Sequence, residues 1–429
     1  MPSRASDLTG GQFSEQQIRS LVEAQARTNL WEGAIRSGKT IASIIAWSNH
    51  LKLTRRAEGE AFVVGRTRDT IARNLFGPMK TVPLLRALLP NTSYTAGAAT
   101  ARVLGQEVHV IGANDKQAEE KIRGLTGRSC YLDEITVLPA PVFRQSLGRL
   151  SVRQARLFGT TNPGNPQHWL KTEYLDRARD LDLATWHFRI DDNPHLDPDY
   201  VRSIKQEYVG LWYRRMIDGA WVMAEGAVYD RWDPDLHVVK QLPPIDRVLA
   251  AGVDYGTTNA FAALMLCLTR DGRLCFTREY RHDSRKAHKQ LTDAEYSTAL
   301  SNWIAAGPDL GEPGPPRFVC VDPSAESFQV QAHRDGIRGI TDADNAVVDG
   351  IRLVSSLIAL GRLVVHESCE GWINEVAGYS WDDKAAEKGD DKPIKVGDHS
   401  LDAGRYAIKT TQSVWQRHVP LTPWQPAAA

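Results

Sequence analysis

The sequence has few cysteines and no excess of charge of either sign, and these two shortages exclude several kinds of protein. None of its five cysteines belongs to a C-x-x-C pair; they are Cys130, Cys267, Cys275, Cys320 and Cys369. We therefore do not expect a zinc ribbon. We expect the five thiols to be buried and reduced. Lys plus Arg and Asp plus Glu each number 52, so the formal net charge is zero. This balance excludes a wholly basic nucleic-acid coat, and any DNA contact must come from local patches of Lys and Arg.

Long apolar runs are missing as well. No segment approaches the ~18 consecutive apolar residues of a membrane-spanning helix. The first residues, MPSRASDLTGGQFSEQQ, contain no apolar core of a signal peptide. We therefore expect the protein to act in a reducing cytoplasm. The 429 residues, of which 42% are hydrophobic and 24% charged, suit a globular chain of two or three domains.

The order of apolar and amphipathic segments predicts an α/β protein in several parts. Within residues 1–180, helical stretches alternate with short apolar strands, at 61–65, 107–111, 129–132 and 155–159. This alternation favours a parallel sheet covered on both faces. Residues 181–245 are interpreted as a small lid or linker subdomain. From 246 to 412, three consecutive strands and then helix, strand, helix, strand and helix follow the order of a ribonuclease-H-like domain. The tail, 413–429, is predicted to be flexible.

One motif is specific by itself, because residues 33–40 follow the phosphate-loop pattern G-x-x-x-x-G-K-[ST]. They are Gly33, Ala34, Ile35, Arg36, Ser37, Gly38, Lys39 and Thr40. In such a loop the backbone N–H groups surround the phosphates, the lysine contacts the β and γ oxygens, and the hydroxyl side chain binds Mg²⁺. The sequence therefore predicts an ATP site with Lys39 and Thr40 in those two roles.

Two further strand ends complete the predicted ATPase. The apolar run SCYL ends at Asp133 and Glu134. We expect the aspartate to bind the water shell of Mg²⁺ and the glutamate to polarise the attacking water. The segment GTTNP ends another strand, and its Asn162 is placed to respond to the loss of the γ-phosphate. Its alternative is an ordinary Asn-Pro turn. With the phosphate loop, these residues predict a P-loop ATPase of the ASCE type.

Three arginines could offer positive charge to the γ-phosphate. Arg36 lies inside the phosphate loop, and Arg123 and Arg128 lie in KIRGLTGR, just before the strand that ends at Asp133. Each could act on its own site or on that of a neighbouring subunit. The alternative for each is a solvated loop arginine.

The second half of the chain places aspartates at strand ends and on a helix. Asp254 ends its first strand (GVDYG), Asp322 ends its fourth (VCVDP), and Asp402 lies in the last helix. Isolated aspartates at strand ends are usually turn or cap residues, but this strand order lets the three converge. Convergent carboxylates need divalent cations, and two metal ions about 3.5–4 Å apart can cut a phosphodiester. The sequence thus predicts a nuclease that uses Mg²⁺ or Mn²⁺. It also predicts that removing any one of the three charges relieves repulsion in the metal-free protein.

Three neighbours are further candidates for this centre. His399 and Asp398 precede Asp402 in GDHSLDAGRY, and His399 shares a helix face with Asp402. Glu279 lies in the third strand (TREY). Its alternative is an exposed strand glutamate.

Seven motifs follow one another along almost the whole chain: GAIRSGKT, RGLTGR followed by CYLDE, GTTNP, EGAVYDRWD, GVDYGTTN, VCVDPSA and HSLDAGRY. In their order and spacing they resemble the large terminase subunit of tailed bacteriophages. The resemblance implies an ATP-driven motor that moves viral double-stranded DNA into a preformed procapsid. It also implies a metal-dependent endonuclease that cuts the DNA concatemer when packaging starts and ends. Its partners would be the portal protein and a small terminase subunit. The chain would form a ring on the portal, in the host cytoplasm, and be absent from the mature virion.

The same resemblance implies residue roles. By this resemblance the phosphate loop, Asp133 and Glu134 carry out ATP hydrolysis. Asn162 belongs to the segment that couples hydrolysis to movement. The nuclease metals fall to Asp254, Asp322 and Asp402, with His399 beside them. The middle acid varies within that family, so Glu279 and Asp398 stay open.

Two other hypotheses compete. A helicase–nuclease of repair or recombination would share the motor, but it should show more helicase motifs and a second motor domain, which the sequence lacks. A scaffold without catalysis should have lost Lys39, Glu134 or one of the aspartates, and all of them are present.

Overall fold

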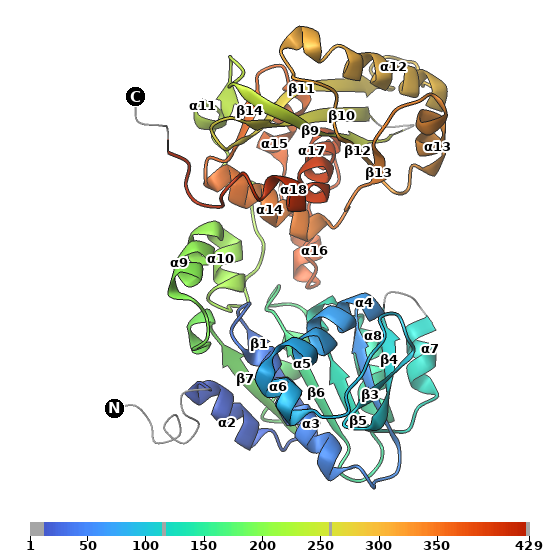
Figure 1. The fold of residues 1–429 in the computed structure, drawn as a ribbon, viewed down its shortest axis with the longest axis vertical. Coiled ribbons are helices and arrows are strands. Elements are labelled where there is room, and N and C mark those ends of the chain that lie inside the picture. Colours follow the sequence, from blue (N-terminus) through green and yellow to red (C-terminus); the bar gives the residue numbers. More distant parts are fainter. Residues whose placement is uncertain (1–12, 114–116, 257–259, 426–429) are drawn as a thin grey trace. The chain divides into compact units, whose positions relative to one another are not determined.

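The computed structural model describes residues 13–113, 117–256 and 260–425, and the chain divides into two compact units (Figure 1). The first unit comprises Met1–Lys205, Gly210–Met223 and Glu387–Asp390. The second comprises Gln206–Val209, Ala224–Ala386 and Asp391–Ala429. Within the described ranges, no helix is both long and apolar enough to cross a membrane. Each unit has its own seven-stranded sheet, and the predicted boundaries at residues 180, 245 and 412 stay predictions.

The first sheet is parallel except at one edge. Its strand order is β3-β4-β2-β5-β6-β1-β7, and only β3 runs antiparallel to its neighbour. The strands are β1 (Thr28–Gly33), β2 (Glu60–Gly65), β3 (Thr100–Val103), β4 (Gln106–Gly112), β5 (Gly127–Leu132), β6 (Arg156–Thr161) and β7 (Leu183–Phe188). The central strands are short apolar runs buried on both faces, as expected of a parallel sheet covered by helices.

Side chains that alternate along these strands fill two separate cores, one on each face of the sheet. On β1, Trp31 belongs to one hydrophobic cluster and its neighbour Leu30 to the other. On β6, Phe158 and Leu157 divide in the same way, because successive strand residues point to opposite faces. The helical segments are α2 (Glu15–Glu23), α3 (Lys39–Leu53), α4 (Arg68–Ile71), η1 (Ala72–Phe76), α5 (Gly77–Thr81), α6 (Pro83–Leu88), α7 (Gln117–Arg123), η2 (Ile135–Val137), α8 (Ala140–Arg149), η3 (Lys171–Leu175), η4 (Ile190–Asp192), α9 (Pro198–Glu207) and α10 (Gly210–Met216).

The second sheet confirms the predicted run of three strands. Strands β9, β10 and β11 pair antiparallel, and the remaining strands are parallel to their neighbours, in the order β13-β12-β9-β10-β11-β14-β8. The strands are β8 (Val238–Val239), β9 (Ile245–Asp254), β10 (Ala260–Thr269), β11 (Leu274–Asp283), β12 (Phe318–Val321), β13 (Ile340–Asp342) and β14 (Leu363–His366). The predicted order of elements, a largely parallel α/β sheet followed by the strand and helix order of a ribonuclease-H-like domain, is confirmed. The short strand β13 was not expected from the sequence.

Helix α17 (His399–Thr410) lies against β9 and β10 and is almost entirely buried. Its approach is close at Gly252, where an added Cβ would lie 1.9 Å from the carbonyl oxygen of Ala403. Glycine at this position therefore sets the distance between β9 and the helix that carries Asp402. The other helical segments are α11 (Pro234–His237), α12 (Asp293–Ala305), η5 (Pro308–Leu310), α13 (Glu326–Arg334), α14 (Val347–Ala359), α15 (Glu370–Gly378), α16 (Asp383–Glu387) and α18 (Gln412–Trp415).

The C-terminal residues differ from the flexible tail that the sequence predicts for 413–429. Trp415 and Val419 are fully buried. The backbone N–H of Trp424 donates to the carbonyl oxygen of Leu360 at 2.8 Å, and the guanidinium of Arg273 lies 4.0 Å from the Trp424 ring centroid. Apolar burial and this cation–π contact hold the segment against the second unit as far as Trp424.

Candidate functional site

The carboxyl ends of β1, β5 and β6 border a cavity of about 870 Å³ in the first unit. Strand β6 lies between the other two, and its register pairs Thr161 with Glu32 of β1 and Gly159 with Leu132 of β5. The residues that follow these strands therefore meet at one edge of the sheet, where open α/β folds bind ligands. Nine predicted residues line the cavity: Ile35, Arg36, Ser37, Gly38, Lys39, Thr40, Asp133, Glu134 and Asn162.

The start of the phosphate loop packs tightly against its neighbours. Gly33 has φ +131°, and an added Cβ would lie 2.0 Å from the carbonyl oxygen of Phe188, so only glycine fits. The N–H of Ala34 donates to that same oxygen at 2.7 Å. Arg36 has φ +56°, a left-handed conformation that costs energy for a non-glycine residue, and its carbonyl oxygen accepts from Nδ2 of Asn193 at 2.7 Å. These contacts tie the phosphate loop to the end of β7 and to Asn193.

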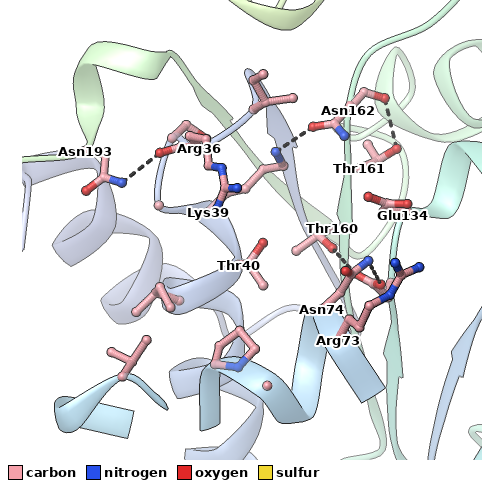
Figure 2. Close-up of a pocket in the computed structure, with 18 of the residues that line it drawn as sticks. Arg36, Lys39, Thr40, Arg73, Asn74, Glu134, Thr160, Thr161, Asn162 and Asn193 are labelled. Carbon is pink, nitrogen blue, oxygen red and sulfur yellow. Dashed lines mark hydrogen bonds between the residues drawn. The ribbon is translucent and has the colours of Figure 1, made fainter. Parts of the chain in front are cut away.

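Lys39 lies in the first turn of α3 and is buried. Figure 2 shows its side chain reaching across the cavity to Asn162, where Nζ donates to Oδ1 at 2.7 Å. Nζ also donates to the carbonyl oxygen of Ala34 at 2.8 Å. Burial lowers the pKa of Lys39 to about 8, although the carboxylates of Glu134 and Asp133 oppose the change. Both acceptors are uncharged, so an anionic phosphate oxygen would be a stronger partner for the ammonium group.

Asp133 is a buried carboxylate held by two donors. Nδ2 of Asn74 lies 3.0 Å from its Oδ2, and Oγ1 of Thr160 lies 3.3 Å from its Oδ1. Burial, and then the charge of Glu134, raise the pKa of Asp133 to about 6. A buried carboxylate with uncompensated charge, and the hydroxyl of Thr40 facing the same cavity, are the oxygen ligands that Mg²⁺ prefers. This donor set fits the predicted ion.

Glu134 has an unusual backbone. Its φ is +51°, so it is a second left-handed non-glycine residue among those lining the cavity. Such conformations concentrate at functional sites, where the surrounding fold compensates for the strain. Here the strained turn directs the residue after Asp133 to the cavity.

The predicted coupling segment is bonded to the loop that follows Glu134. The N–H of Thr136 donates to Oγ1 of Thr161 at 3.1 Å, and the hydroxyl of Thr136 donates to the carbonyl oxygen of Asn162 at 3.2 Å. A displacement of Asn162 would therefore strain this neighbouring loop. This pattern suits the predicted role of the segment in coupling.

Of the three arginine candidates, only Arg36 lines the cavity of its own chain. Arg123 ends α7, is exposed, and forms an ion pair with Glu119 at 3.2 Å. Arg128 lies at the start of β5, the opposite end of the strand from Asp133, where its Nη2 donates to Gln106 at 2.9 Å. Neither Arg123 nor Arg128 is among the residues that line this cavity, and their proposed roles stay predictions.

In the second unit, α17 brings the predicted acids toward one another. Nδ1 of His399 lies 2.8 Å from Oδ2 of Asp254, at the end of β9. The hydroxyl of Tyr406 donates to Oδ2 of Asp322 at 2.7 Å. Burial raises the pKa of Asp254, the bond to His399 opposes that change, and the negative charge of Asp402 adds to it. The three predicted aspartates therefore lie along the first two turns of this helix, with Asp254 beside His399 and Asp322 beside Tyr406. Thr257, Thr258 and Asn259 of the GVDYGTTN motif lie outside the described residues.

Asp402 already has two positive partners. Nη2 of Arg405 lies 2.8 Å from its Oδ1, and Nζ of Lys395 lies 2.7 Å from its Oδ2. Lys395 also lies 3.0 Å from Oδ2 of Asp398. Within the described part of the chain, no group of three or more His, Cys, Asp or Glu side chains is placed to hold a metal ion. The predicted ligands converge, but in this arrangement they do not fit a metal site.

These ion pairs correct one expectation. The sequence predicted that loss of any of the three charges would relieve repulsion. The side chain of Arg405 is only 2% exposed, so removing the charge of Asp402 would leave a buried guanidinium without its counter-ion. That loss is destabilising.

Glu279 belongs to a separate network. Its Oε2 accepts from the N–H of Gly371 at 2.7 Å, and its Oε1 accepts from the hydroxyl of Ser400. It lines a cavity of about 590 Å³ together with Arg281 and Glu375. Burial raises the pKa of Glu279. The structure therefore gives it neither contact with Asp254 nor the exposed position of the alternative interpretation.

The comparisons with known proteins agree with this architecture. A family model described as "Terminase large subunit, T4likevirus-type, N-terminal" matches residues 30–233. The structure is similar to that of the large terminase from a thermophilic bacteriophage, at 32% identity and a TM-score of 0.83, over 93% of this chain and 99% of that one. The chain belongs to the large terminase family. That family comprises packaging ATPases that carry a nuclease.

Two more structures of the same thermophilic-phage terminase match as well. Its complex with ADP is 31% identical with a TM-score of 0.83, over 94% of this chain and 100% of that one. Its complex with ATP-gamma-S is 32% identical with a TM-score of 0.80, over 92% and 98%. No curated protein matches the chain.

Several side chains that line the cavity had no predicted role, and four of them are polar or charged groups close to the predicted residues. These four are Arg73, Asn74, Thr160 and Asn193. Thr160 lies within GTTNP, so its place beside Asn162 was a usable signal. Arg73 and Asn74 follow no strand and match no motif, and only the fold brings them to the phosphate loop.

Proposed function

We propose that this chain hydrolyses ATP in the cavity of the first unit and uses the energy to move double-stranded DNA into a procapsid. One observation carries the proposal: the lysine and hydroxyl of the phosphate loop, two acidic side chains and an asparagine, which follow three parallel strands, line one cavity. The solved complexes of the thermophilic-phage terminase with ADP and ATP-gamma-S support nucleotide binding by this related chain.

An apolar recess beside the phosphate loop suits the nucleobase. It has a volume of about 420 Å³ and shares Gly38, Ile41, Val82 and Asn193 with the larger cavity. Its remaining surface is lined by three apolar residues, Phe13, Pro83 and Leu84, and by Gln17 and His195. Ligand pockets of this kind pair an apolar wall with a few polar groups. The triphosphate would then extend from this recess along the loop.

The phosphate-binding steps use groups that are already in place. The ammonium of Lys39 would exchange the neutral oxygens of Ala34 and Asn162 for phosphate oxygens. Mg²⁺ held by Thr40 and Asp133 would neutralise charge on the β and γ phosphates. Glu134 would orient the attacking water and take its proton.

Coupling would follow from the same exchange. When a phosphate oxygen accepts from Nζ of Lys39, the 2.7 Å hydrogen bond between Lys39 and Asn162 would break. When the phosphate leaves, that bond would re-form. Asn162 is joined through Thr136 to the loop after Glu134. Occupancy of the site is thereby transmitted to the polypeptide around it. This is how hydrolysis would drive movement of DNA.

We also propose that the second unit cuts DNA, with Asp254, Asp322 and Asp402 as its acidic centre and His399 beside Asp254. The convergence of these groups around α17 supports this assignment. Their dependence on Mg²⁺ or Mn²⁺ stays a prediction, because Asp402 is paired with Lys395 and Arg405.

The proposed partners are those of a packaging machine: double-stranded DNA, a portal protein, a small terminase subunit, and further copies of this chain in a ring. With a formal net charge of zero, one chain would hold DNA weakly, and several copies would add their contacts. Arg123 is exposed at the end of α7 and could complete the site of an adjacent copy.

The test is ATP hydrolysis by the purified chain, measured with and without double-stranded DNA and with and without a procapsid that bears its portal. Packaged DNA is scored by protection from added DNase. We expect hydrolysis to rise when both DNA and procapsid are present. Hydrolysis that is indifferent to both would contradict a packaging motor. Translocation on free DNA without a procapsid would favour the helicase–nuclease.

A further inference from the structure

The wall that faces the phosphate loop is formed by a helical run containing a π-helical turn. This turn, η1 (Ala72–Phe76), joins α4 to α5. Its Arg73 and Asn74 line the nucleotide cavity, as does Gly77 at the start of α5. π-Helical turns are rare and frequently lie at functional sites. Figure 2 shows Arg73 and Asn74 across the cavity from Arg36 and Lys39, which come from the loop.

Asn74 contacts the carboxylate that is proposed to bind Mg²⁺. Its Nδ2 donates to Oδ2 of Asp133 at 3.0 Å, while Thr160 donates to Oδ1 from the opposite side at 3.3 Å. Two donors on two oxygens fix the plane of a carboxylate. Each oxygen has a second lone pair for the ion or its water shell.

Arg73 differs from the other arginine of the same run. The side chain of Arg68, on α4, is tied to the backbone, with Nε 3.2 Å from the carbonyl oxygen of Val110 and Nη1 3.1 Å from that of Gly97. Arg73 is exposed, and its guanidinium makes no hydrogen bond or ion pair with the residues that the structure describes. A guanidinium with all its donors available, at the edge of a cavity for a triphosphate, suits two phosphate oxygens at once.

The position of Arg73 determines which phosphate of a bound nucleotide its guanidinium would contact. Lys39 and Arg36 approach from the phosphate loop, whereas Arg73 approaches from beside Asn74, which touches Asp133. Asp133 and Thr40 would hold Mg²⁺, which would supply charge neutralisation for the outer phosphates, so we infer that the side of the cavity beside Asp133 meets the terminal phosphate.

We propose that η1 completes the nucleotide site from within the same chain. Arg73 binds the terminal phosphate of a nucleoside triphosphate, and Asn74 is a positioning residue that orients Asp133 toward Mg²⁺. The inference rests on the proposed ATPase function and adds to it a contact that distinguishes triphosphate from diphosphate.

The first experiment compares the full-length chain with Arg73→Ala and Arg73→Lys, using ATP-gamma-S and ADP as probes in a fluorescence competition assay. We expect Arg73→Ala to weaken ATP-gamma-S binding by about 10-fold or more and ADP binding by less than about 2-fold. Arg73→Lys should restore part of the difference, because it keeps the charge and loses the paired geometry. Arg86→Ala is the matched control, since Arg86 is an exposed arginine on α6 that does not line the cavity.

The same variants are measured for binding to a DNA duplex at several salt concentrations, which tests whether Arg73 instead contacts DNA. A weaker salt dependence with unchanged ATP-gamma-S affinity would overturn the proposal. So would equal losses for ATP-gamma-S and ADP. If the unaltered chain binds neither nucleotide, it is the proposed ATPase function that fails, and the two failures are thereby distinguished.

The second experiment tests Asn74→Ala. We expect the Mg²⁺ concentration for half-maximal ATPase to rise by about 10-fold, while nucleotide affinity measured in EDTA stays within about 2-fold of the unaltered chain. Thermal melting in EDTA reports whether the variant is folded. A folded variant with an unchanged Mg²⁺ requirement would refute the positioning role of Asn74.

Discussion

The two candidate sites balance their charges in different ways. In the nucleotide cavity, Lys39 bonds only to neutral oxygens and the guanidinium of Arg36 faces open space, so positive charge is available to an incoming ligand. In the acidic centre of the second unit, Asp402 is already bonded to Lys395 and Arg405, and Asp254 to His399. The first site is arranged to receive an anion. The second is satisfied by groups of its own chain.

This difference has an energetic consequence. Exchanging a neutral acceptor for a phosphate oxygen gains a charge-assisted hydrogen bond, and little has to be broken first. Separating Asp402 from its partners breaks ion pairs around a buried carboxylate, which costs about 3–5 kcal/mol when one partner is lost outright. A metal ion in the second unit must therefore compete with side chains, whereas ATP in the first unit need not.

The largest expected effect is on hydrolysis by Lys39→Ala. Because the lysine supplies the charge that replaces the bonds to Ala34 and Asn162, we expect ATPase activity to fall about 10³-fold. Lys52→Ala, an exposed lysine on the same helix, is the control and should hydrolyse normally. Cutting of plasmid DNA should persist in both variants. A folded Lys39→Ala chain that no longer cuts DNA would show that the two sites are not independent.

The second prediction separates two aspartates that the sequence treats alike. Asp254→Asn and Asp402→Asn should both stop plasmid cutting, because each removes a carboxylate from the acidic centre. Their melting temperatures in EDTA should differ. Asp254→Asn should be level or higher, since burial already disfavours that charge. Asp402→Asn should melt at a lower temperature and lose about 3 kcal/mol of folding free energy, because Arg405 loses its partner. Equal shifts in the same direction would contradict the role of these ion pairs.

The third prediction concerns Glu134→Gln. Nucleotide binding rests on the phosphate loop and Mg²⁺, so affinity for ATP should stay near that of the unaltered chain. Turnover should fall by ~10² or more, the usual contribution of a general base. Single-turnover hydrolysis and competition binding measure the two quantities separately. Normal turnover in this variant would assign water activation to another group.

Sequence patterns predicted the elements that carry local signals. The phosphate loop, the strand ending at Asp133 and the segment with Asn162 each combine a short apolar run with a fixed polar end, and all three border one cavity. Tertiary partners carry no such signal. Asn74 reaches Asp133 only because a π-helical turn redirects it, and Lys395 pairs with Asp402 only because the chain folds back at that point.

The same limit explains the two departures. The C-terminal segment was expected to be flexible because it is short and rich in proline, yet Trp415 and Val419 find apolar partners that no local pattern reveals. The acidic centre was expected to carry unrelieved repulsion in the metal-free protein, because a list of motifs does not show that Lys395 and Arg405 form ion pairs with Asp402. Local pattern identifies which residues carry chemistry, and only the fold shows how their charges are balanced.

The fourth prediction tests the competition between Lys395 and a metal ion. Lys395→Met keeps the length of the side chain and removes its charge, which leaves Oδ2 of Asp402 open. We expect Mn²⁺ to bind about 10-fold more tightly, a change of about 1.4 kcal/mol. The melting temperature in EDTA should fall, because Asp402 and Asp398 lose a shared cation. Calorimetric Mn²⁺ titration and melting in EDTA give the two values. Unchanged Mn²⁺ affinity would mean that Lys395 does not occupy the place of a metal ion.

The smallest expected effect lies in the first unit. It tests whether the ionised carboxylate of Asp133 lowers the stability of the folded chain when no ligand is bound. Burial raises the pKa of Asp133 to about 6 from an ordinary value of 3.8. A carboxyl with a raised folded-state pKa favours folding below pH 4 and loses that contribution as the pH rises through 6. Above that pH the ionised group costs on the order of 3 kcal/mol without a ligand. Asp133→Asn should therefore melt a few °C higher than the unaltered chain at pH 7.5, in EDTA and without nucleotide, since about 1 kcal/mol moves a unit of this size by 2–4 °C. The advantage should shrink toward pH 4.5.

The exposed Asp180→Asn is the control and should show no such dependence on pH. If Asp133→Asn is no more stable at pH 7.5, then Asn74, Thr160 and Lys39 already compensate the charge. The charges of the first site would then be balanced by groups of the same chain, as those of the second site are, and the proposed difference between the two sites would be wrong.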